Sequence, residues 1–223
     1  MKPVCLIIGA GAGIGGHVGK RFARDGYHII LSRRSDASGL ENLVKDIVQD
    51  GGSAEGRLMN IVDENAIEDL IHDIEKNSGP IEVVVHNIGA QIGNRRLTDT
   101  SLKTFELGWR LSCFSLFRLA YTVLPLMAQR GKGTLLVTSS TAAQRGNAGQ
   151  HSHAAAMGGR RMLCQSLNAE FASQNIHVAH IVIDGAVDAP DTLGKMLGPE
   201  AFEKLRKDKG SEDGLMLPEH IAD

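Results

Sequence analysis

The chain has 223 residues, of which 42% are apolar and 22% charged, and its formal net charge is −2 at pH 7. These values are ordinary for one α/β domain of a soluble protein, so we expect residues 1–223 to form a single domain. The nearly balanced charge excludes an electrostatic argument for nucleic acid or an anionic membrane as partner, and we expect neither.

Cysteine usage and hydropathy bear on the compartment. The three cysteines, Cys5, Cys113 and Cys164, lack metal or redox spacing and indicate buried free thiols of a reducing environment. No apolar run approaches the roughly 20 residues that span a bilayer. The first three residues lead directly into an apolar strand, which leaves no room for a signal peptide. We therefore expect a cytoplasmic protein.

Apolar segments of strand length alternate with amphipathic segments of helix length. We expect strands at residues 4–8, 28–32, 54–59, 81–86, 133–138 and 176–183. We expect helices at residues 13–25, 40–50, 64–77, 101–129 and 152–173. Nearly continuous apolar strands are covered on both faces, so the pattern predicts a doubly wound parallel sheet of the Rossmann type, in three α/β/α layers.

The C-terminal part departs from this alternation. Residues 188–210 predict a flap over the carboxyl edge of the sheet, with Leu193, Met196 and Leu197 as its apolar side. Residues 218–223 resemble the opening of a further helix. We therefore expect that a last helix and strand are missing from the sequence or absent from the protein.

A glycine-rich turn follows the first strand. Glycines allow a sharp turn and a close approach to a ligand, and the N–H groups that open the next helix favour an anion such as a pyrophosphate. The alternative is a structural turn without a ligand. The residues expected to form the turn are Gly9, Gly11, Gly13, Ile14 and Gly15.

The end of the second strand discriminates between cofactors. An acidic residue there binds the ribose hydroxyls of NAD and repels a 2′-phosphate. This chain has Arg33 and Arg34 instead, whose guanidinium groups suit a phosphate. We therefore favour NADP(H) over NAD(H), with two solvated arginines as the alternative.

Taken together, these motifs resemble those of the short-chain dehydrogenase/reductase family along essentially the whole chain. Residues 8–15, IGAGAGIG, resemble its TGxxxGIG turn, and His86-Asn87-Ile88-Gly89 resembles its NNAG motif. Asn60-Ile61 stands where the family's Asp-Val pair contacts adenine, and Gly185 and Val187 match its PG-x-V segment, with Asp184 in place of proline. The resemblance implies that these residues bind a nicotinamide dinucleotide.

The family's catalytic set is only partly present. Its members use an Asn, a Ser and a Tyr-x-x-x-Lys pair. Ser140 stands at the Ser position, but the Tyr, Lys and Asn positions hold His153, Met157 and Ser112.

A His-for-Tyr exchange is chemically self-consistent. Tyrosine, with a pKa near 10, needs a neighbouring cation to transfer a proton at neutral pH, whereas histidine titrates near 6.5 without one. His153 is therefore a candidate acid/base and Ser140 a candidate for orienting the substrate oxygen. The alternatives are drift after loss of catalysis for His153, a strand-end cap for Ser140, and, least favoured, a metal site from His151 and His153. Arg160 is expected to lie at the surface or in a subunit interface rather than to supply charge to the site.

Two functions follow from this reading. The first is an NADP(H)-dependent oxidoreductase that acts on a small carbonyl or alcohol. The second is a non-catalytic NADP(H)-binding sensor or assembly partner. The resemblance also implies a homodimer or homotetramer, paired through the helices at 101–129 and 152–173. Their apolar residues include Leu111, Phe114, Phe117, Met162 and Leu167.

Overall fold

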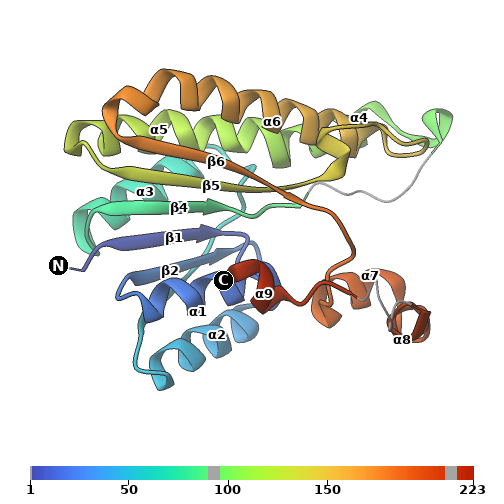
Figure 1. The fold of residues 1–223 in the computed structure, drawn as a ribbon, viewed down its shortest axis with the longest axis horizontal. Coiled ribbons are helices and arrows are strands. Elements are labelled where there is room, and N and C mark those ends of the chain that lie inside the picture. Colours follow the sequence, from blue (N-terminus) through green and yellow to red (C-terminus); the bar gives the residue numbers. More distant parts are fainter. Residues whose placement is uncertain (1, 90–95, 209–214) are drawn as a thin grey trace.

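The computed structural model describes residues 2–89, 96–208 and 215–223, and its centre is a six-stranded sheet (Figure 1). All neighbouring strands are parallel, in the order β3-β2-β1-β4-β5-β6. This order, with helices on both faces, confirms the predicted doubly wound fold. The strands are β1 (Val4–Ile8), β2 (His28–Arg33), β3 (Ser53–Leu58), β4 (Ile81–His86), β5 (Gly133–Ser140) and β6 (Ile176–Ile183).

Helices cover the two faces of the sheet in separate groups. The helices are α1 (Ile14–Arg24), α2 (Ala37–Gln49), α3 (Ala66–Asn77), α4 (Leu102–Trp109), α5 (Ser115–Arg130), α6 (His151–Phe171), α7 (Lys195–Leu197), α8 (Pro199–Asp208) and α9 (Pro218–Ala222). Figure 1 shows α3, α5 and α6 on one side of the strands and α1 and α2 on the other.

β1 separates two hydrophobic cores because its side chains alternate between the faces. Val4, Leu6 and Ile8 belong to the core under α3, α5 and α6. Cys5 and Ile7 belong to the core under α1 and α2. All five side chains are buried, which explains why the strand is apolar throughout and directs its carboxyl end to one fixed edge.

The long helix expected at residues 101–129 is divided. A π turn, Arg110–Phe114, separates α4 from α5. Leu102–Arg130 as a whole is long and apolar enough, by length and composition, to cross a membrane, so the expectation that no apolar run reaches that length needs correction. The apolar character has a local cause, since α5 buries Leu119, Val123 and Met127 in the core beneath the sheet.

The C-terminal residues return over the carboxyl end of β1. Pro190–Gly194 forms a π turn, and α7 and α8 follow it. A Cβ added to Gly13 would lie 3.2 Å from the Ala189 Cβ, so this segment touches the glycine turn. Val187 pairs with Met216 in an isolated bridge, and α9 packs on α1. The flap at 188–210 stays a prediction, and its last two residues lie outside the described residues.

Candidate functional site

The glycine turn brings three backbone segments into close contact. Gly9 has a φ of +92°, a value that favours glycine, and a Cβ there would overlap the Asn87 carbonyl oxygen. A Cβ on Gly15 would lie 2.5 Å from the Gly9 carbonyl oxygen. Gly13 caps α1, and no side chain of the described residues accepts a hydrogen bond from its first turn. The Gly16 N–H donates to the Gly11 carbonyl oxygen at 2.8 Å, and no hydrogen bond within the described residues occupies the N–H groups of Ile14 and Gly15, which therefore remain available to an anion.

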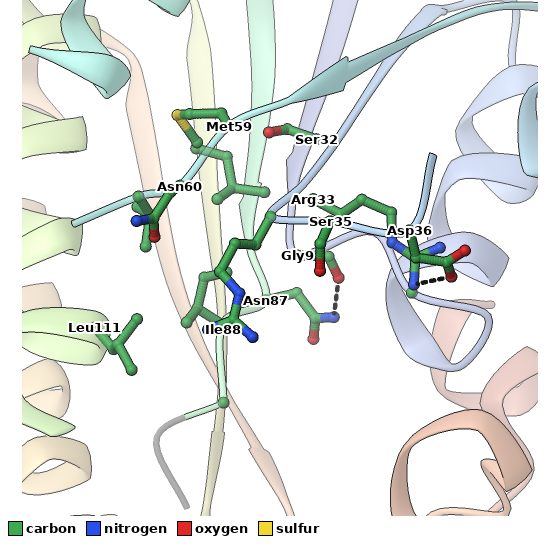
Figure 2. Close-up of a pocket in the computed structure, with 15 residues that line it drawn as sticks. Gly9, Ser32, Arg33, Ser35, Asp36, Met59, Asn60, Asn87, Ile88 and Leu111 are labelled. Atoms are coloured by element: carbon green, nitrogen blue, oxygen red, sulfur yellow. Dashed lines mark hydrogen bonds and ion pairs between the residues drawn. The ribbon is translucent and has the colours of Figure 1, made fainter. Parts of the chain in front are cut away.

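Asn87 ties the turn to the neighbouring strands. Its side-chain Nδ2 donates to the Gly9 carbonyl oxygen at 3.0 Å, the contact drawn as a dashed line in Figure 2. Its Oδ1 accepts a hydrogen bond from Thr138 Oγ1 at 2.8 Å. The carboxyl ends of β1, β4 and β5 are thereby held together by one amide.

A cavity of about 360 Å³ opens beside this turn. Figure 2 shows its walls, which come from the carboxyl ends of β1, β2, β3 and β4 and from the π turn. Its lining contains predicted cofactor-binding residues from four separate segments: Gly9, Gly11, Arg33, Asn60, Ile61, Asn87 and Gly89. It also contains residues that sequence reasoning did not assign to a site: Ser35, Asp36, Met59 and Leu111.

Five predicted cofactor residues do not line this cavity. Gly13, Ile14 and Gly15 open α1 beneath the turn, where Gly15 permits the close packing described above. Gly185 and Val187 lie in the segment that pairs with Met216, and a Cβ on Gly185 would lie 2.9 Å from the Met216 sulfur. The structure therefore brings together the first four strand ends and leaves the sixth to one side of the cavity.

Arg33 at the cavity wall is held by an acidic neighbour. Its Nη2 lies 3.0 Å from Asp36 Oδ2. Asp36 is the N-cap of α2 and accepts a hydrogen bond from the Gly39 N–H at 3.0 Å. That hydrogen bond first, and the Ser38 hydroxyl second, hold the pKa of Asp36 below its ordinary value. The guanidinium is therefore oriented by an ionised carboxylate, and the three-residue spacing from Arg33 to Asp36 is the sequence signal for this pair.

Ser140 and His153 meet at the carboxyl end of β5. Ser140 ends the strand, His153 lies in the first turn of α6, and Ser140 Oγ and His153 Nε2 share a hydrogen bond of 3.0 Å. Burial, and then the charge of Arg160, lower the pKa of His153 below its ordinary value. The imidazole is therefore neutral at pH 7 and can accept a proton.

The other two family positions are buried and uncharged. Ser112 lies in the π turn, and its Oγ has no hydrogen-bond partner among the residues that the structure describes. Met157 is 2% exposed, and Ser139 Oγ approaches its sulfur at 3.5 Å. A π turn within a helix often marks a functional site, and this one contains Ser112, for which the resemblance implies the family's Asn position.

Arg160 does not lie at the surface, so that expectation is wrong. Its side chain is 1% exposed. Its Nη2 donates to the Ile88 carbonyl oxygen at 2.7 Å, and its Nη1 donates to the Thr138 carbonyl oxygen. Seven residues separate Arg160 from His153, which is two helical turns, so both project from the same face of α6 toward the sheet.

Comparison with known proteins agrees with this geometry. A family model described as short chain dehydrogenase matches residues 3–193. The chain belongs to the short-chain dehydrogenase/reductase family. The 7alpha-hydroxysteroid dehydrogenase of Escherichia coli strain K12 is 29% identical over 200 residues, which are 90% of this chain and 76% of that protein. The 3-oxoacyl-[acyl-carrier-protein] reductase of Thermotoga maritima is 28% identical over 189 residues, 85% of this chain and 76% of the relative.

Solved structures show the same fold. A 7 alpha-hydroxysteroid dehydrogenase in complex with NADH and 7-oxo glycochenodeoxycholic acid superposes with a TM-score of 0.85 at 28% identity, covering 99% of this chain and 84% of that one. A short-chain dehydrogenase from Rhodopseudomonas palustris superposes with a TM-score of 0.77 at 28% identity, covering 94% of this chain and 92% of that one. The protein is thus a member of an oxidoreductase family with a nucleotide-binding fold.

Proposed function

We propose that this protein is an NADP(H)-dependent oxidoreductase that interconverts a small-molecule carbonyl compound and its alcohol, with Ser140 and His153 as its proton-transferring pair. The observation that carries the proposal is the 3.0 Å hydrogen bond between Ser140 Oγ and His153 Nε2. It lies at the same edge of the sheet as the glycine-lined cavity, where open α/β sheets bind their ligands.

The described residues fit the adenosine and pyrophosphate part of a dinucleotide. The positive φ of Gly9 and the contact space that Gly15 leaves form a cradle that a Cβ would fill. The N–H groups that open α1 would face the pyrophosphate. Asn60 and Ile61 in the cavity wall would contact the adenine, as the family resemblance implies. At the family's lysine position the fit differs, because Met157 cannot bind the nicotinamide ribose through a charge.

In the proposed reduction, the bound cofactor supplies a hydride to the carbonyl carbon. The chain must then supply a proton to the carbonyl oxygen. A serine hydroxyl accepts one hydrogen bond and donates another. Ser140 therefore accepts a proton from protonated His153 Nε2 while it donates its own to the substrate oxygen. This relay compensates for the shorter reach of imidazole compared with phenol. In the oxidation the same atoms move the proton in reverse.

The preference for NADP(H) rests on Arg33 and Arg34. Both line the cavity at the end of β2, and a guanidinium pairs well with a 2′-phosphate. Asp36 orients Arg33 but also neutralises part of its charge. Related structures with NADH and with NADPH or NADP are both known, so the discrimination must come from this chain's own residues.

The relatives guide the choice of substrates for a test. By name, one acts on a 7α-hydroxysteroid and another on a 3-oxoacyl group. Both names describe interconversion of a secondary alcohol and a ketone. We therefore propose the same functional group as substrate, and a panel should contain 7-oxo steroids, 3-oxoacyl thioesters and small ketones.

The test is NADPH oxidation over this panel with three variants. We expect turnover on at least one carbonyl compound, and a loss of about 100-fold or more in His153→Ala because general acid catalysis contributes about that much. Ser140→Ala should lose a similar amount, since it breaks the relay. His151→Ala is the matched control on the same helix turn and should retain its rate. Equal rates in His153→Ala and the wild type would contradict the assignment.

One observation favours a non-catalytic NADP(H)-binding protein as a second candidate. Met157, for which the resemblance implies the family's lysine position, carries no charge, is buried, and lies with its sulfur 3.5 Å from Ser139 Oγ. A sensor or assembly partner would bind NADPH without oxidising it. Tight binding in calorimetry, combined with no turnover over the whole panel, would support this candidate over the first.

We also propose a homodimer or homotetramer that acts in the cytoplasm. Of the apolar residues expected at the pairing helices, Phe117 and Met162 are 48% and 61% exposed. Leu167 instead belongs to the core, and Leu111 lines the cavity. Tyr121 on α5, 76% exposed, extends the apolar surface on which a second copy would pack.

A further inference from the structure

Arg160 is a buried cation without a carboxylate partner among residues 2–89, 96–208 and 215–223. Every ion pair described for these residues involves other side chains. Burying an unpaired charge is costly, and arginine is rarely fully buried. Burial lowers the pKa of Arg160 to about 10, so the group still carries its charge at pH 7. Such a residue requires an explanation beyond packing.

The guanidinium connects the cavity wall with the strand that carries Ser140. Nη2 donates to the carbonyl oxygen of Ile88, which lines the cavity. Nη1 donates to the carbonyl oxygen of Thr138, whose hydroxyl holds Asn87 and which lies two residues before Ser140. One side chain thus fixes the distance between the ends of β4 and β5. The planar fork of arginine suits two such acceptors, while the single ammonium of lysine does not.

The titratable groups that face Arg160 come from four elements and are neutral at pH 7. His153 and Cys164 lie on α6, Cys113 in the π turn, His86 on β4 and His180 on β6. Burial is the first cause of the shifted pKa in each of them. Arg161 adds a second positive charge that acts on His180.

His86 illustrates the neutral state of this cluster. Ser115 Oγ donates its single proton to the Leu111 carbonyl oxygen at 2.7 Å. His86 Nε2 lies 2.9 Å from Ser115 Oγ and must therefore donate to that hydroxyl oxygen. His86 Nδ1 then carries no proton, and the imidazole is neutral. The charge of Arg160 is therefore not cancelled by its surroundings.

We propose that Arg160 is a positioning residue of the reaction centre: its fork fixes the ends of β4 and β5, and with them Ser140, and its buried charge lies on the same face of α6 as His153. This inference rests on the proposed function for its catalytic consequence, but the state of His153 is a property of the protein alone. Met157 carries no charge and cannot take this role. The charge comes instead from Arg160, one helical turn further along α6.

The first experiment measures the titration of His153 by NMR in the protein without added ligand, with His153→Ala used to assign its signal. Arg160→Met removes the charge and keeps an unbranched side chain, so the pKa of His153 should rise toward its ordinary value. Arg160→Lys retains the charge and should leave this pKa unchanged. Arg161→Met is the matched control on the same helix and should also leave it unchanged.

The second experiment measures the pH profile of carbonyl reduction in the same variants. In Arg160→Met, the pH range over which the reduction rate falls should move to higher pH, because the pKa of His153 rises. In Arg160→Lys this range should stay in place while kcat falls by about tenfold or more, because one carbonyl contact is lost and Ser140 shifts. Circular dichroism confirms that each variant is folded, and Arg160→Gln replaces Arg160→Met as the uncharged variant if Arg160→Met does not fold.

The outcomes separate this inference from the proposed function. An unchanged His153 titration in Arg160→Met would overturn the inference, whether or not the protein turns over any substrate. A shifted titration with no turnover on any carbonyl would support the electrostatic role and contradict the oxidoreductase function. A loss of activity in Arg160→Met and Arg160→Lys with identical pH profiles would reduce Arg160 to a structural clamp and overturn its charge role.

Discussion

His153 changes what the proton-transfer step requires from its surroundings. A phenol must be pushed toward ionisation by a cation, whereas an imidazole has an ordinary pKa near 6.5 and needs no cation. Met157, at the position for which the resemblance implies the family's lysine, lies in a small apolar cluster with Ala142 and Ala156. The remaining charge, on Arg160, opposes protonation of His153.

The pH dependence of the reaction follows from this arrangement. Burial, and then the charge of Arg160, hold the pKa of His153 below its ordinary value, so the protonated donor for carbonyl reduction is lost as pH rises through that lowered pKa. We expect kcat for reduction to fall across this range and kcat for alcohol oxidation to rise and then level off. A reduction rate that stays constant from pH 5 to about 8 would contradict a histidine donor.

Arg33, at the other end of the site, carries the proposed preference for NADP(H). We expect Arg33→Ala to weaken NADPH binding by about tenfold or more, the usual value of a lost charge-assisted hydrogen bond, and to leave NADH binding nearly unchanged. Calorimetric titration with both cofactors measures the difference. Arg24→Ala, an exposed arginine at the far end of α1, is the control. Equal weakening of both cofactors would show that Arg33 does not contact the 2′-phosphate.

At the scale of elements, the glycine turn is a contact between β1, α1 and the end of β4. Gly9→Ala should lower the free energy of unfolding by more than the roughly 1–2 kcal/mol of a left-handed alanine, because its Cβ also overlaps the Asn87 carbonyl group. It should also abolish NADPH binding.

Gly26 provides the matched control for this substitution. Its φ is +89°, close to that of Gly9, but nothing lies within 4 Å of an added Cβ. Gly26→Ala should therefore show only the backbone cost and retain cofactor binding. Urea unfolding and NADPH titration compare the two variants, and equal effects would show that the contact with Asn87 does not matter.

The elements were largely predictable from the sequence because their apolar periodicity is local. The strand bounds differ from the expected ones by two residues at most, whereas the 3.0 Å hydrogen bond between Ser140 and His153 was not predicted. Arg160 was not predictable in the same way. Its acceptors, the carbonyl groups of Ile88 and Thr138, lie 72 and 22 residues away in the sequence. No local sequence pattern indicates that these groups lie close together in the fold. The π turn was missed because its sequence continues the apolar helix pattern.

For the whole molecule, the apolar surface on α4, α5 and α6 bears on assembly. Trp109, Phe117, Tyr121 and Met162 are between 42% and 76% exposed on helices that pack against one another. We expect the wild type to sediment as a dimer or tetramer, and Tyr121→Arg to reduce the assembly because it places a charge in the apolar contact. Leu58→Arg, which changes a 54% exposed residue at the end of β3, is the control. A monomeric wild type would contradict this expectation.

Across the whole molecule, the hydrogen bonds of Asn87, Thr138 and Arg160 connect the cavity beside the glycine turn with the Ser140–His153 pair. The measurement that tests this account most directly is single-turnover NADPH oxidation by wild type, His153→Ala and His151→Ala at saturating NADPH and carbonyl substrate. The account predicts hydride transfer in the wild type and in His151→Ala, and a loss of about 100-fold in His153→Ala. Equal rates in all three proteins, or tight NADPH binding without hydride transfer to any carbonyl in the panel, would contradict it.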